Sequence, residues 1–338
     1  MAEPTPVPGI RNLAFDELVG VLRAVAEPTR LRLVTLLGQG ELTVTEITQV
    51  IGQSQPRVSR HLRLLVDAGV LERSPEGAFV FYGLRDGAAS ALATQISAAA
   101  EAGDAVLAAD AAALERVRQT RSAAAAAYLS EHGDELVALH ALHAPEAEIE
   151  REMLELLVKE GPIGRLLDIG TGTGRALGLL APHSQRSIGL DVDHEMLLLA
   201  RAALGDAQVA RASVRQGDVH RPPFEAASFD VAVMHFVLHL LDDPSGALVD
   251  AGRLLRPGGR LLVVDFASHS LDFLRERHGH RRLGIADADM STWAQEAGLA
   301  IEAERTLSPP AQSASGLTVH LWLLRARTPT GRGTARTS

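Results

Sequence analysis

A glycine-rich turn in the second half of the chain has residues suited to hold a nucleoside against the backbone. The turn is Leu167-Asp168-Ile169-Gly170-Thr171-Gly172-Thr173-Gly174, and it follows a short apolar run. Glycines at such a place let the backbone pass close under a ligand and turn sharply from a strand into a helix. A loop that cradles a dinucleotide would continue with a glycine at position 175, where this chain has Arg175. The turn and its preceding acid therefore favour a ligand that combines an uncharged nucleoside with an ammonium group, over a dinucleotide with its pyrophosphate.

Acidic residues close to two other predicted strand ends could complete that pocket. Asp191 ends the run 188–191, where its carboxylate can accept hydrogen bonds from both hydroxyls of a ribose. In the segment 216–219, Asp218 can accept from an adenine amino group while Val219 meets the edge of the ring. The predicted nucleoside-binding residues are Asp168, Ile169, Gly170, Thr171, Gly172, Thr173, Gly174, Asp191, Val192, Gly217, Asp218, Val219, His235 and Phe236.

Histidines are the candidate catalytic residues of this half of the chain. His235 follows the fourth predicted strand and is a candidate neighbour of the bound nucleoside. His278 and His280, in a basic segment, are candidates for an acceptor site or a lid. For His239 we favour a structural role as a hydrogen-bonded or solvated side chain. No histidine pair has a convincing ligand spacing, so we predict no metal site.

A second group of side chains, in the first quarter of the chain, could contact DNA. The helix predicted from Ser54 to Leu65 has Val58, Leu62 and Leu65 on one face, and amide, hydroxyl and guanidinium groups around the other. Such a helix packs on its domain with one face and offers donors to base edges and phosphates with the other. A solvated arginine-bearing helix would explain the charges alone. The predicted DNA-binding residues are Ser54, Gln55, Arg57, Ser59, Arg60, His61, Arg63 and Arg73.

The elements around this helix predict a helix-turn-helix. Thr43-Val44-Thr45-Glu46 is a capping box, and the helix that it begins should end at Gly52. Ser54 should cap the second helix, Pro56 falls in its first turn, and Gly69 should end it. Two helices joined by about three residues are typical of this motif.

The segments that follow predict a wing and then a helical region. Strand-prone runs at 70–73 and 79–84 flank Ser74-Pro75-Glu76-Gly77, which predicts a hairpin. The next stretch is rich in alanine and favours one or two long helices, which could be a spacer or a dimerisation region. We predict a mainly α winged helix-turn-helix domain at residues 10–86 and a helical linker or dimerisation region at 87–145.

The rest of the chain alternates short apolar strands with helical segments. Four such strands are predicted at 165–169, 187–190, 230–234 and 260–264, and two more at 301–307 and 317–327. This alternation indicates an α/β domain with a parallel sheet and crossover helices. We place that domain at residues 146–327 and predict a disordered tail at 328–338, because the tail is small and polar.

Composition limits the class of protein. The chain has 338 residues, 46% of them hydrophobic and 22% charged, as expected for two globular domains. No apolar stretch is long enough to span a bilayer and the first residues lack a leader pattern, so we expect a cytoplasmic protein. The net charge of −9 argues against binding nucleic acid over a broad surface, so any DNA contact must be local. Cysteine is absent, which excludes disulfides and thiolate sites.

The first domain resembles the ArsR family of dimeric bacterial transcriptional regulators over roughly residues 14–86. The matching segments are Ala26-Glu27-Pro28-Thr29-Arg30-Leu31-Arg32, Ser54-Gln55-Pro56-Arg57-Val58-Ser59-Arg60-His61-Leu62 and Asp67-Ala68-Gly69-Val70-Leu71. The resemblance implies a homodimer on a double-stranded operator. Such proteins often sense metals through cysteines on the first helix of the motif. This chain has Thr43 and Thr45 there, so thiolate sensing is excluded.

The second domain resembles the class I S-adenosylmethionine-dependent methyltransferases over about residues 164–325. The glycine turn, Asp191, the segment 216–219 and Arg253-Leu254-Leu255-Arg256-Pro257-Gly258-Gly259-Arg260 follow in the order and spacing of that family. The resemblance implies a Rossmann-like fold with S-adenosylmethionine as cofactor and S-adenosylhomocysteine as product or effector. A Rossmann-like domain without cofactor is the alternative.

Two functions for the combined chain follow from these resemblances. In the first, it is a DNA-binding regulator whose second domain is an enzyme that methylates an unknown small molecule. In the second, that domain is a non-catalytic sensor of S-adenosylmethionine or S-adenosylhomocysteine that controls repression of methionine-cycle genes. A clear acceptor base would favour the enzyme, and none is evident in the sequence. Arsenite methylation is excluded because it needs cysteine thiolates.

Overall fold

The computed structural model describes residues 13–327 except 102, 141, 160, 162, 208, 210, 211 and 310–315, and only the backbone at 132–140. The chain divides into two compact units, residues 1–125 with 201–215 and residues 126–200 with 216–338. The predicted disordered tail at 328–338 lies outside the described residues. None of the helices in the described ranges is both long and apolar enough to cross a membrane.

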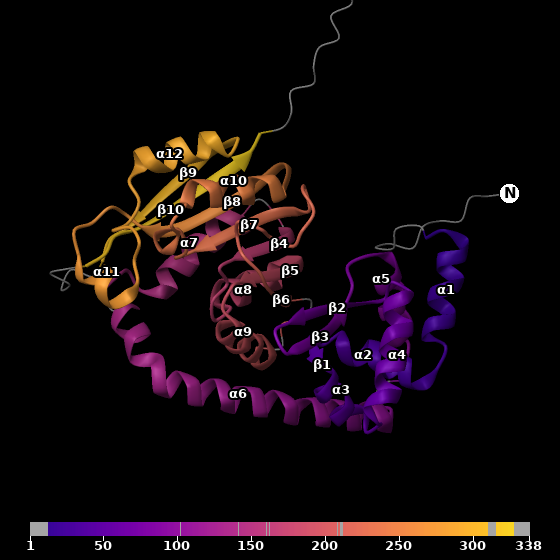
Figure 1. The fold of residues 1–338 in the computed structure, drawn as a ribbon. Helices are drawn as coiled ribbons and strands as arrows, with labels where there is room; N and C mark the ends of the chain where they lie inside the picture. The colour runs from indigo at the N-terminus through magenta and orange to yellow at the C-terminus, as the bar shows by residue number, and fades with distance from the viewer. Residues whose placement is uncertain are drawn as a thin grey trace, which may run out of the picture. The chain divides into compact units, whose positions relative to one another are not determined.

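The N-terminal part is a helical domain with a small sheet (Figure 1). Its elements are α1 (Phe15–Val25), α2 (Pro28–Leu37), β1 (Leu42–Thr43), α3 (Val44–Ile51), α4 (Gln55–Asp67), β2 (Leu71–Glu76), β3 (Phe79–Leu84) and α5 (Ala88–Ala98), followed by the long helix α6 (Ala105–His140). The three strands pair in the order β1-β3-β2, so the hairpin β2–β3 forms the wing. Helix, turn, helix and wing thus occur as predicted.

Local signals place the two helices of the motif. The Thr43 hydroxyl accepts from the Glu46 amide at 3.3 Å while the Glu46 carboxylate accepts from the Thr43 amide at 2.7 Å, which is the predicted capping box. Gly52 ends α3 with a left-handed φ of 72°. Ser54 stands at the start of α4, but its side chain makes no capping hydrogen bond, contrary to expectation.

The wing is longer than predicted. Pro75 pairs with Val80 and Glu76 with Phe79, so both belong to the strands, and only Gly77 and Ala78 form the turn. A two-residue hairpin turn suffices because Gly77 adopts a positive φ of 55°. Proline is tolerated in β2 because it pairs on one side only and lies at the edge of the sheet.

The alanine-rich segment is helical, but its first part belongs to the core of the N-terminal domain. Ala93 of α5 and Ala113, Leu114 and Val117 of α6 are buried in the same apolar cluster as the helix-turn-helix. Arg32 of α2 also donates to both carboxylate oxygens of Asp110, at 2.7 and 2.6 Å. The compact unit therefore extends beyond the predicted boundary at residue 86, because buried apolar contacts and an ion pair continue past it.

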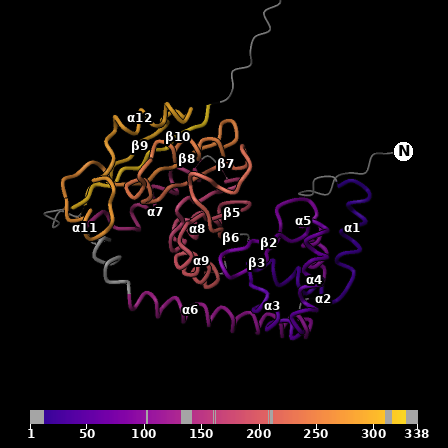
Figure 2. Tube along the Cα trace, viewed as in Figure 1, coloured from indigo at the N-terminus to yellow at the C-terminus, as the bar shows by residue number. Residues whose placement is uncertain are grey.

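The C-terminal part is built on a seven-stranded sheet. Its elements are α7 (Glu146–Val158), β4 (Ile163–Ile169), α8 (Arg175–Leu180), β5 (Ser184–Asp191), α9 (His194–Asp206), β6 (Ala212–Gln216), β7 (Phe229–His235), α10 (Pro244–Leu254), β8 (Leu255–Phe266), α11 (Phe273–His278), α12 (Asp287–Glu296), β9 (Leu299–Leu307) and β10 (Val319–Ala326). The strand order is β6-β5-β4-β7-β8-β10-β9, and β8, β10 and β9 lie side by side in Figure 2.

One strand departs from the predicted parallel sheet. β10 pairs antiparallel with both β8 and β9. A parallel partner needs a crossover long enough to return the chain to the same edge, usually by a helix. No helix of the described residues lies between β9 and β10, so the chain reverses instead.

The order of the strands creates a switch point at the centre of the sheet. From β4 the chain moves outward to β5 and β6, and it then returns to the other side of β4 to form β7 and β8. Ligands of such sheets bind outside the carboxyl ends of the strands on either side of this reversal. The carboxyl ends of β4 and β7 are Ile169 and His235.

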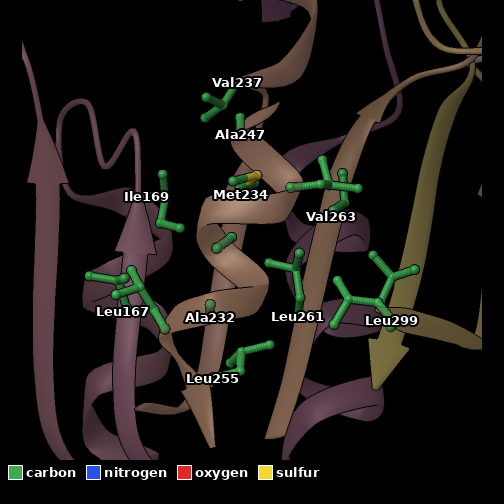
Figure 3. Packing of buried hydrophobic residues seen from close by; sticks show 14 of the residues in the cluster. Leu167, Ile169, Ala232, Met234, Val237, Ala247, Leu255, Leu261, Val263 and Leu299 are labelled. Carbon is green, nitrogen blue, oxygen red and sulfur yellow. The ribbon is translucent and has the colours of Figure 1, made fainter. Parts of the chain in front are cut away.

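Both faces of the sheet are covered. Figure 3 shows Leu167, Ala232 and Leu261 on one face together with Ala247 of α10, and all four are buried in one cluster. The alternating residues Leu166, Val231, Val233 and Leu262 point to the other face and are buried as well. Burial on both faces explains why the strands are nearly continuous apolar runs.

Candidate functional site

The glycine turn leaves β4 at the switch point with three left-handed residues. Gly170, Gly172 and Gly174 have φ values of 69°, 52° and 79°, which other residues adopt only with strain. A Cβ at Gly170 would lie 2.5 Å from Val237, but a Cβ at Gly172 would meet nothing within 4 Å. Gly172 is therefore the place where the turn presents bare backbone to open space, as a close ligand requires.

Asp191 holds this turn against the end of β5. Its Oδ2 accepts from the Gly172 amide at 2.8 Å and its Oδ1 accepts from the Asp193 amide at 3.0 Å. Each carboxylate oxygen has two lone pairs, so both can still accept one further hydrogen bond. The side chain is partly exposed and remains suited to bind a ribose.

Asp168 is enclosed beneath the turn. Its Oδ2 accepts from the Thr171 hydroxyl at 2.6 Å, and its Oδ1 is buried without a hydrogen-bond partner among the described residues. Burial is the main reason that the pKa of this carboxyl is raised to about 7, and the charge of Asp191 adds to the rise. An unpartnered buried carboxylate oxygen is costly unless a donor or a cation meets it.

The remaining residues predicted to bind a nucleoside divide by exposure. Asp218 and Val192 are exposed. The Gly217 amide donates to the carbonyl of Asp191, the residue that holds the glycine turn, at 2.8 Å, so the segment 216–219 lies next to that turn. Ile169 is buried in the apolar core, and it can offer a ligand only its main chain. The turn also contains Thr171, which is buried, and Thr173, which is partly buried. Val219 of the segment 216–219 is buried.

His235 ends β7 and Phe236 follows it, and both rings belong to an aromatic group. Phe236 has a φ of 57°, an unusual value for a residue with a side chain. Its ring lies 4.6 Å from that of His235 and stacks at 4.7 Å on Phe266, which ends β8. Strained backbone of this kind concentrates at functional sites, and here it occurs directly after the strand end at the switch point.

His239 and Asp265 form a buried pair that the sequence interpretation missed. Nδ1 of His239 lies 2.7 Å from Asp265 Oδ1, and the two side chains are 3% and 0% exposed. Asp265 also accepts the amides of Phe266 at 2.8 Å and His239 at 3.3 Å. A carboxylate in this position holds the proton on Nδ1, so Nε2 keeps its lone pair. Among the described residues, none is hydrogen-bonded to Nε2.

Of the two other candidate histidines, only His280 lies in this group. Its ring centroid is 4.2 Å from that of His239, and both of its nitrogens are buried without a hydrogen-bond partner in the described part of the chain. Burial and the neighbouring histidines lower the pKa of His280 to about 4, so its ring is neutral at neutral pH. His278 ends α11, where its ring is 6.4 Å from that of Phe273.

On the N-terminal domain, α4 presents the predicted polar face. Val58, Leu62 and Leu65 are buried. Ser59 is partly buried, and the exposed predicted residues are Ser54, Gln55, Arg57, Arg60, Arg63 and, in the wing, Arg73. His61 instead turns toward the domain, with Nδ1 3.5 Å from Glu27 Oε2. An arginine-rich face next to a wing has the donors that DNA recognition needs.

Comparison with known protein families matches both halves of the chain. Residues 27–73 match the family described as bacterial regulatory protein, arsR family. Residues 167–263 match the family described as methyltransferase domain.

The chain is a fusion of these two kinds of domain. The matches cover the helix-turn-helix of the arsR-family domain and most of the sheet of the methyltransferase domain, which holds the glycine turn.

Individual relatives are similar to parts of the chain. An uncharacterized 37.1 kDa protein in transposon TN4556 of Streptomyces fradiae is 34% identical over 150 residues, which are 40% of this chain and 43% of that protein. The demethylmenaquinone methyltransferase of Tropheryma whipplei (strain Twist) is 37% identical over 109 residues, 32% of this chain and 44% of that protein. The chain thus spans less than half the length of these curated relatives.

A solved structure is also similar. The N-methyltransferase NodS from Bradyrhizobium japonicum WM9, in complex with S-adenosyl-L-homocysteine, has a TM-score of 0.44 and 25% identity. The alignment covers 54% of this chain and 87% of that chain.

Proposed function

We propose that the methyltransferase domain binds S-adenosylmethionine and methylates a small molecule, while the arsR-family domain binds an operator in double-stranded DNA as a homodimer. The family matches and the exposed arginines of α4 support DNA binding. The glycine turn, Asp191 and the switch point support the cofactor.

The residues around the switch point fit this cofactor in their hydrogen-bonding groups and charge. Gly172 offers bare backbone to open space, and Asp191 retains acceptor capacity for ribose hydroxyls. The unpartnered Oδ1 of Asp168 suits a cationic ammonium group, which would remove the cost of its burial. When bound, S-adenosylmethionine supplies a methyl group on a sulfonium whose sulfur leaves with the electron pair.

The observation that carries the catalytic assignment is the His239–Asp265 pair. Transfer to an O–H or N–H group requires a place for the proton, and a positioned imidazole is the usual one. Asp265 orients the ring and stabilises the imidazolium that forms, so Nε2 of His239 is the proposed proton acceptor. A domain that only senses the cofactor needs no such base, and the pair therefore favours the enzyme.

Calorimetric titration of the full chain with S-adenosylmethionine and S-adenosylhomocysteine tests the cofactor site. Charge-assisted hydrogen bonds contribute about 1.5–3 kcal/mol each, so Asp191→Ala should weaken both ligands by tens of fold or more. Both ligands carry the same ribose. Glu302→Ala is the matched control, because this carboxylate lies on β9 and pairs with Arg325 outside the glycine turn.

A second variant tests the turn itself. A side chain at Gly172 would fill the open space and would have to adopt a positive φ, so Gly172→Val should also abolish tight binding. If Asp191→Ala bound both nucleosides as the wild type does, the assigned pocket would be wrong.

A further inference from the structure

An open cavity of about 500 Å³ lies in the methyltransferase domain and is rich in hydrogen-bond donors. The volume is within the range of about 300–1,000 Å³ typical of small-molecule sites. Its polar wall consists of Asp242, Ser268, His269, Arg275, Arg281 and Arg282.

The cavity is connected to the proposed cofactor site by one short segment after β7. Val237, at the beginning of this segment, lies where a Cβ on Gly170 would come within 2.5 Å of it. The carbonyl of His239 accepts the amides of Arg281 and Arg282, at 2.9 and 3.1 Å. Leu241, at the end of the segment, lines the cavity. The cavity therefore lies beyond the carboxyl ends of β7 and β8, at the same edge of the sheet as the proposed cofactor site.

The arginines of this wall retain donors for a ligand. In the described ranges the Arg282 guanidinium makes no hydrogen bond; its Nε is enclosed, whereas its NH1 and NH2 are not. The guanidinium lies 5.4 Å from the centre of the Trp293 ring. Arg275 is exposed and uses NH1 for the Arg281 carbonyl at 3.0 Å. Guanidinium groups present several donors in a fixed fork that matches carboxylate and phosphate oxygens.

His269 contributes a neutral ring to the same wall. Its Nδ1 accepts from the Leu271 amide at 3.2 Å, so the proton of the neutral ring is on Nε2. That Nε2 is buried without a hydrogen-bond partner in the part of the chain that the structure describes. Burial, with the neighbouring His239, lowers the pKa of His269 and keeps the ring neutral.

Among the described residues of the wall, Asp242 is the one carboxylate, and it is already engaged. Asp242 lies 3.4 Å from Nε of Arg281, and both side chains are largely exposed. One carboxylate against three guanidinium groups leaves the wall positive and short of acceptors. A cation or a purely donating ligand would therefore be matched poorly here, and an anion, whose oxygens only accept, would be matched well.

We propose that this cavity holds the methyl acceptor and that the acceptor is a small organic anion, a carboxylate or a phosphate ester, with a separate O–H or N–H group. The proposal rests on the proposed methyltransferase function. The acidic group binds to the guanidinium groups of Arg275 and Arg282. The O–H or N–H loses its proton to Nε2 of His239, its electron pair forms the bond to the methyl carbon, and the carbon–sulfur bond breaks with its pair on sulfur.

The test uses three probes with the same phenol, measured by saturation-transfer NMR on the full chain, with and without S-adenosylhomocysteine. They are 4-hydroxybenzoate, 4-hydroxyphenyl phosphate and the neutral 4-hydroxybenzamide. We expect at least one anion to bind and the amide not to bind. The preference between the two anions distinguishes a carboxylate acceptor from a phosphate ester.

Matched variants locate the binding. Arg282→Gln and Arg275→Gln should each weaken the bound anion by about tenfold or more, because a charge-assisted hydrogen bond is lost. Arg253→Gln is the control, since Arg253 lies on α10 outside the cavity and pairs with Asp250. Arg275 is exposed, so its variant keeps the test valid if Arg282→Gln fails to fold.

Two results would overturn the proposal. One is the absence of binding by both anions, and the other is binding that Arg275→Gln and Arg253→Gln affect equally. S-adenosylmethionine titrated into the same samples separates this proposal from the function on which it rests. Cofactor binding without anion binding refutes only the acceptor class, whereas anion binding without cofactor binding refutes the methyltransferase assignment.

Discussion

The carboxyl of Asp168 is buried at a cost in folding free energy, which the proposed ligand would reduce. It lies below the glycine turn with one oxygen bonded to Thr171 and the other unpartnered among described residues. Burial raises its pKa from an ordinary 3.8 to about 7. The folded chain therefore holds a proton at a pH where the unfolded chain has lost it, and folding stability falls as pH rises from about 4 to about 7.

We predict that Asp168→Asn removes this loss of stability. The thermal midpoint of the wild type should fall relative to that of the variant between about pH 4 and pH 7, because only the wild type must ionise a buried carboxyl. The difference should correspond to a few kcal/mol. Thermal unfolding followed by circular dichroism across this range measures it. Parallel curves for the two proteins would show that Asp168 does not titrate there.

The His239–Asp265 pair gives a second prediction at this scale. Both oxygens of Asp265 accept hydrogen bonds from N–H groups. In the Asp265→Asn variant, the side-chain NH2 group must therefore face one of these N–H donors. We expect a loss of about 1–3 kcal/mol of stability and a lower population of the Nδ1–H tautomer of His239. Histidine 15N NMR reports the tautomer, and Asp250→Asn on α10 is the control. A wild-type His239 protonated on Nε2 would contradict its role as proton acceptor.

The sequence predicts the glycine turn and Asp191 but not the pairing of His239 with Asp265, and the reason is physical. The glycine turn and Asp191 are recognisable because their function depends on local backbone form at strand ends. His239 and Asp265 are 26 residues apart and meet only through the pairing of β7 with β8. A signal existed, since Asp265 is a carboxylate at the carboxyl end of a central strand, but nothing local indicates its partner.

At the scale of the element, α4 of the arsR-family domain divides its side chains by face. Helical periodicity predicts its buried residues correctly, and Val58, Leu62 and Leu65 are all 0% exposed. It did not predict that His61 would face Glu27, because that contact depends on where α2 begins. Arg121 of α6 donates to both oxygens of Glu46 at 2.7 Å, so α3 is held from outside the motif as well.

We predict that Arg57→Ala and Arg60→Ala weaken operator binding without changing the affinity for S-adenosylmethionine. Both side chains are exposed on α4, and a bidentate contact to a base contributes about 1–3 kcal/mol of discrimination. Gel shifts measure the loss, with Arg116→Ala on the exposed side of α6 as the control. Unchanged shifts in both variants would mean that α4 is not the recognition helix.

At the scale of the whole molecule, charge restricts how the chain can bind DNA. A net charge of −9 gives no general attraction to phosphate, so binding must depend on the local arginines of α4 and the wing. One such helix reaches few base pairs, and tight specificity requires a second copy. We propose the exposed apolar side chains of α1 as the surface for it, since Phe15 is 78% and Leu22 is 45% exposed.

We therefore predict that a homodimer binds an inverted repeat whose half-sites are about 34 Å apart, one helical turn, or a multiple of that distance. Replacing Phe15 and Leu22 together by serine should shift the protein toward monomers in analytical ultracentrifugation and weaken binding to the full repeat. The serine variant should still fold, because neither side chain is buried. Val249→Ser, at an exposed apolar position on α10, is the matched control and should change neither property. Footprinting gives the half-site spacing. A monomer that bound one isolated half-site as tightly as the full repeat would contradict the dimer, because its single α4 would then supply all of the specificity.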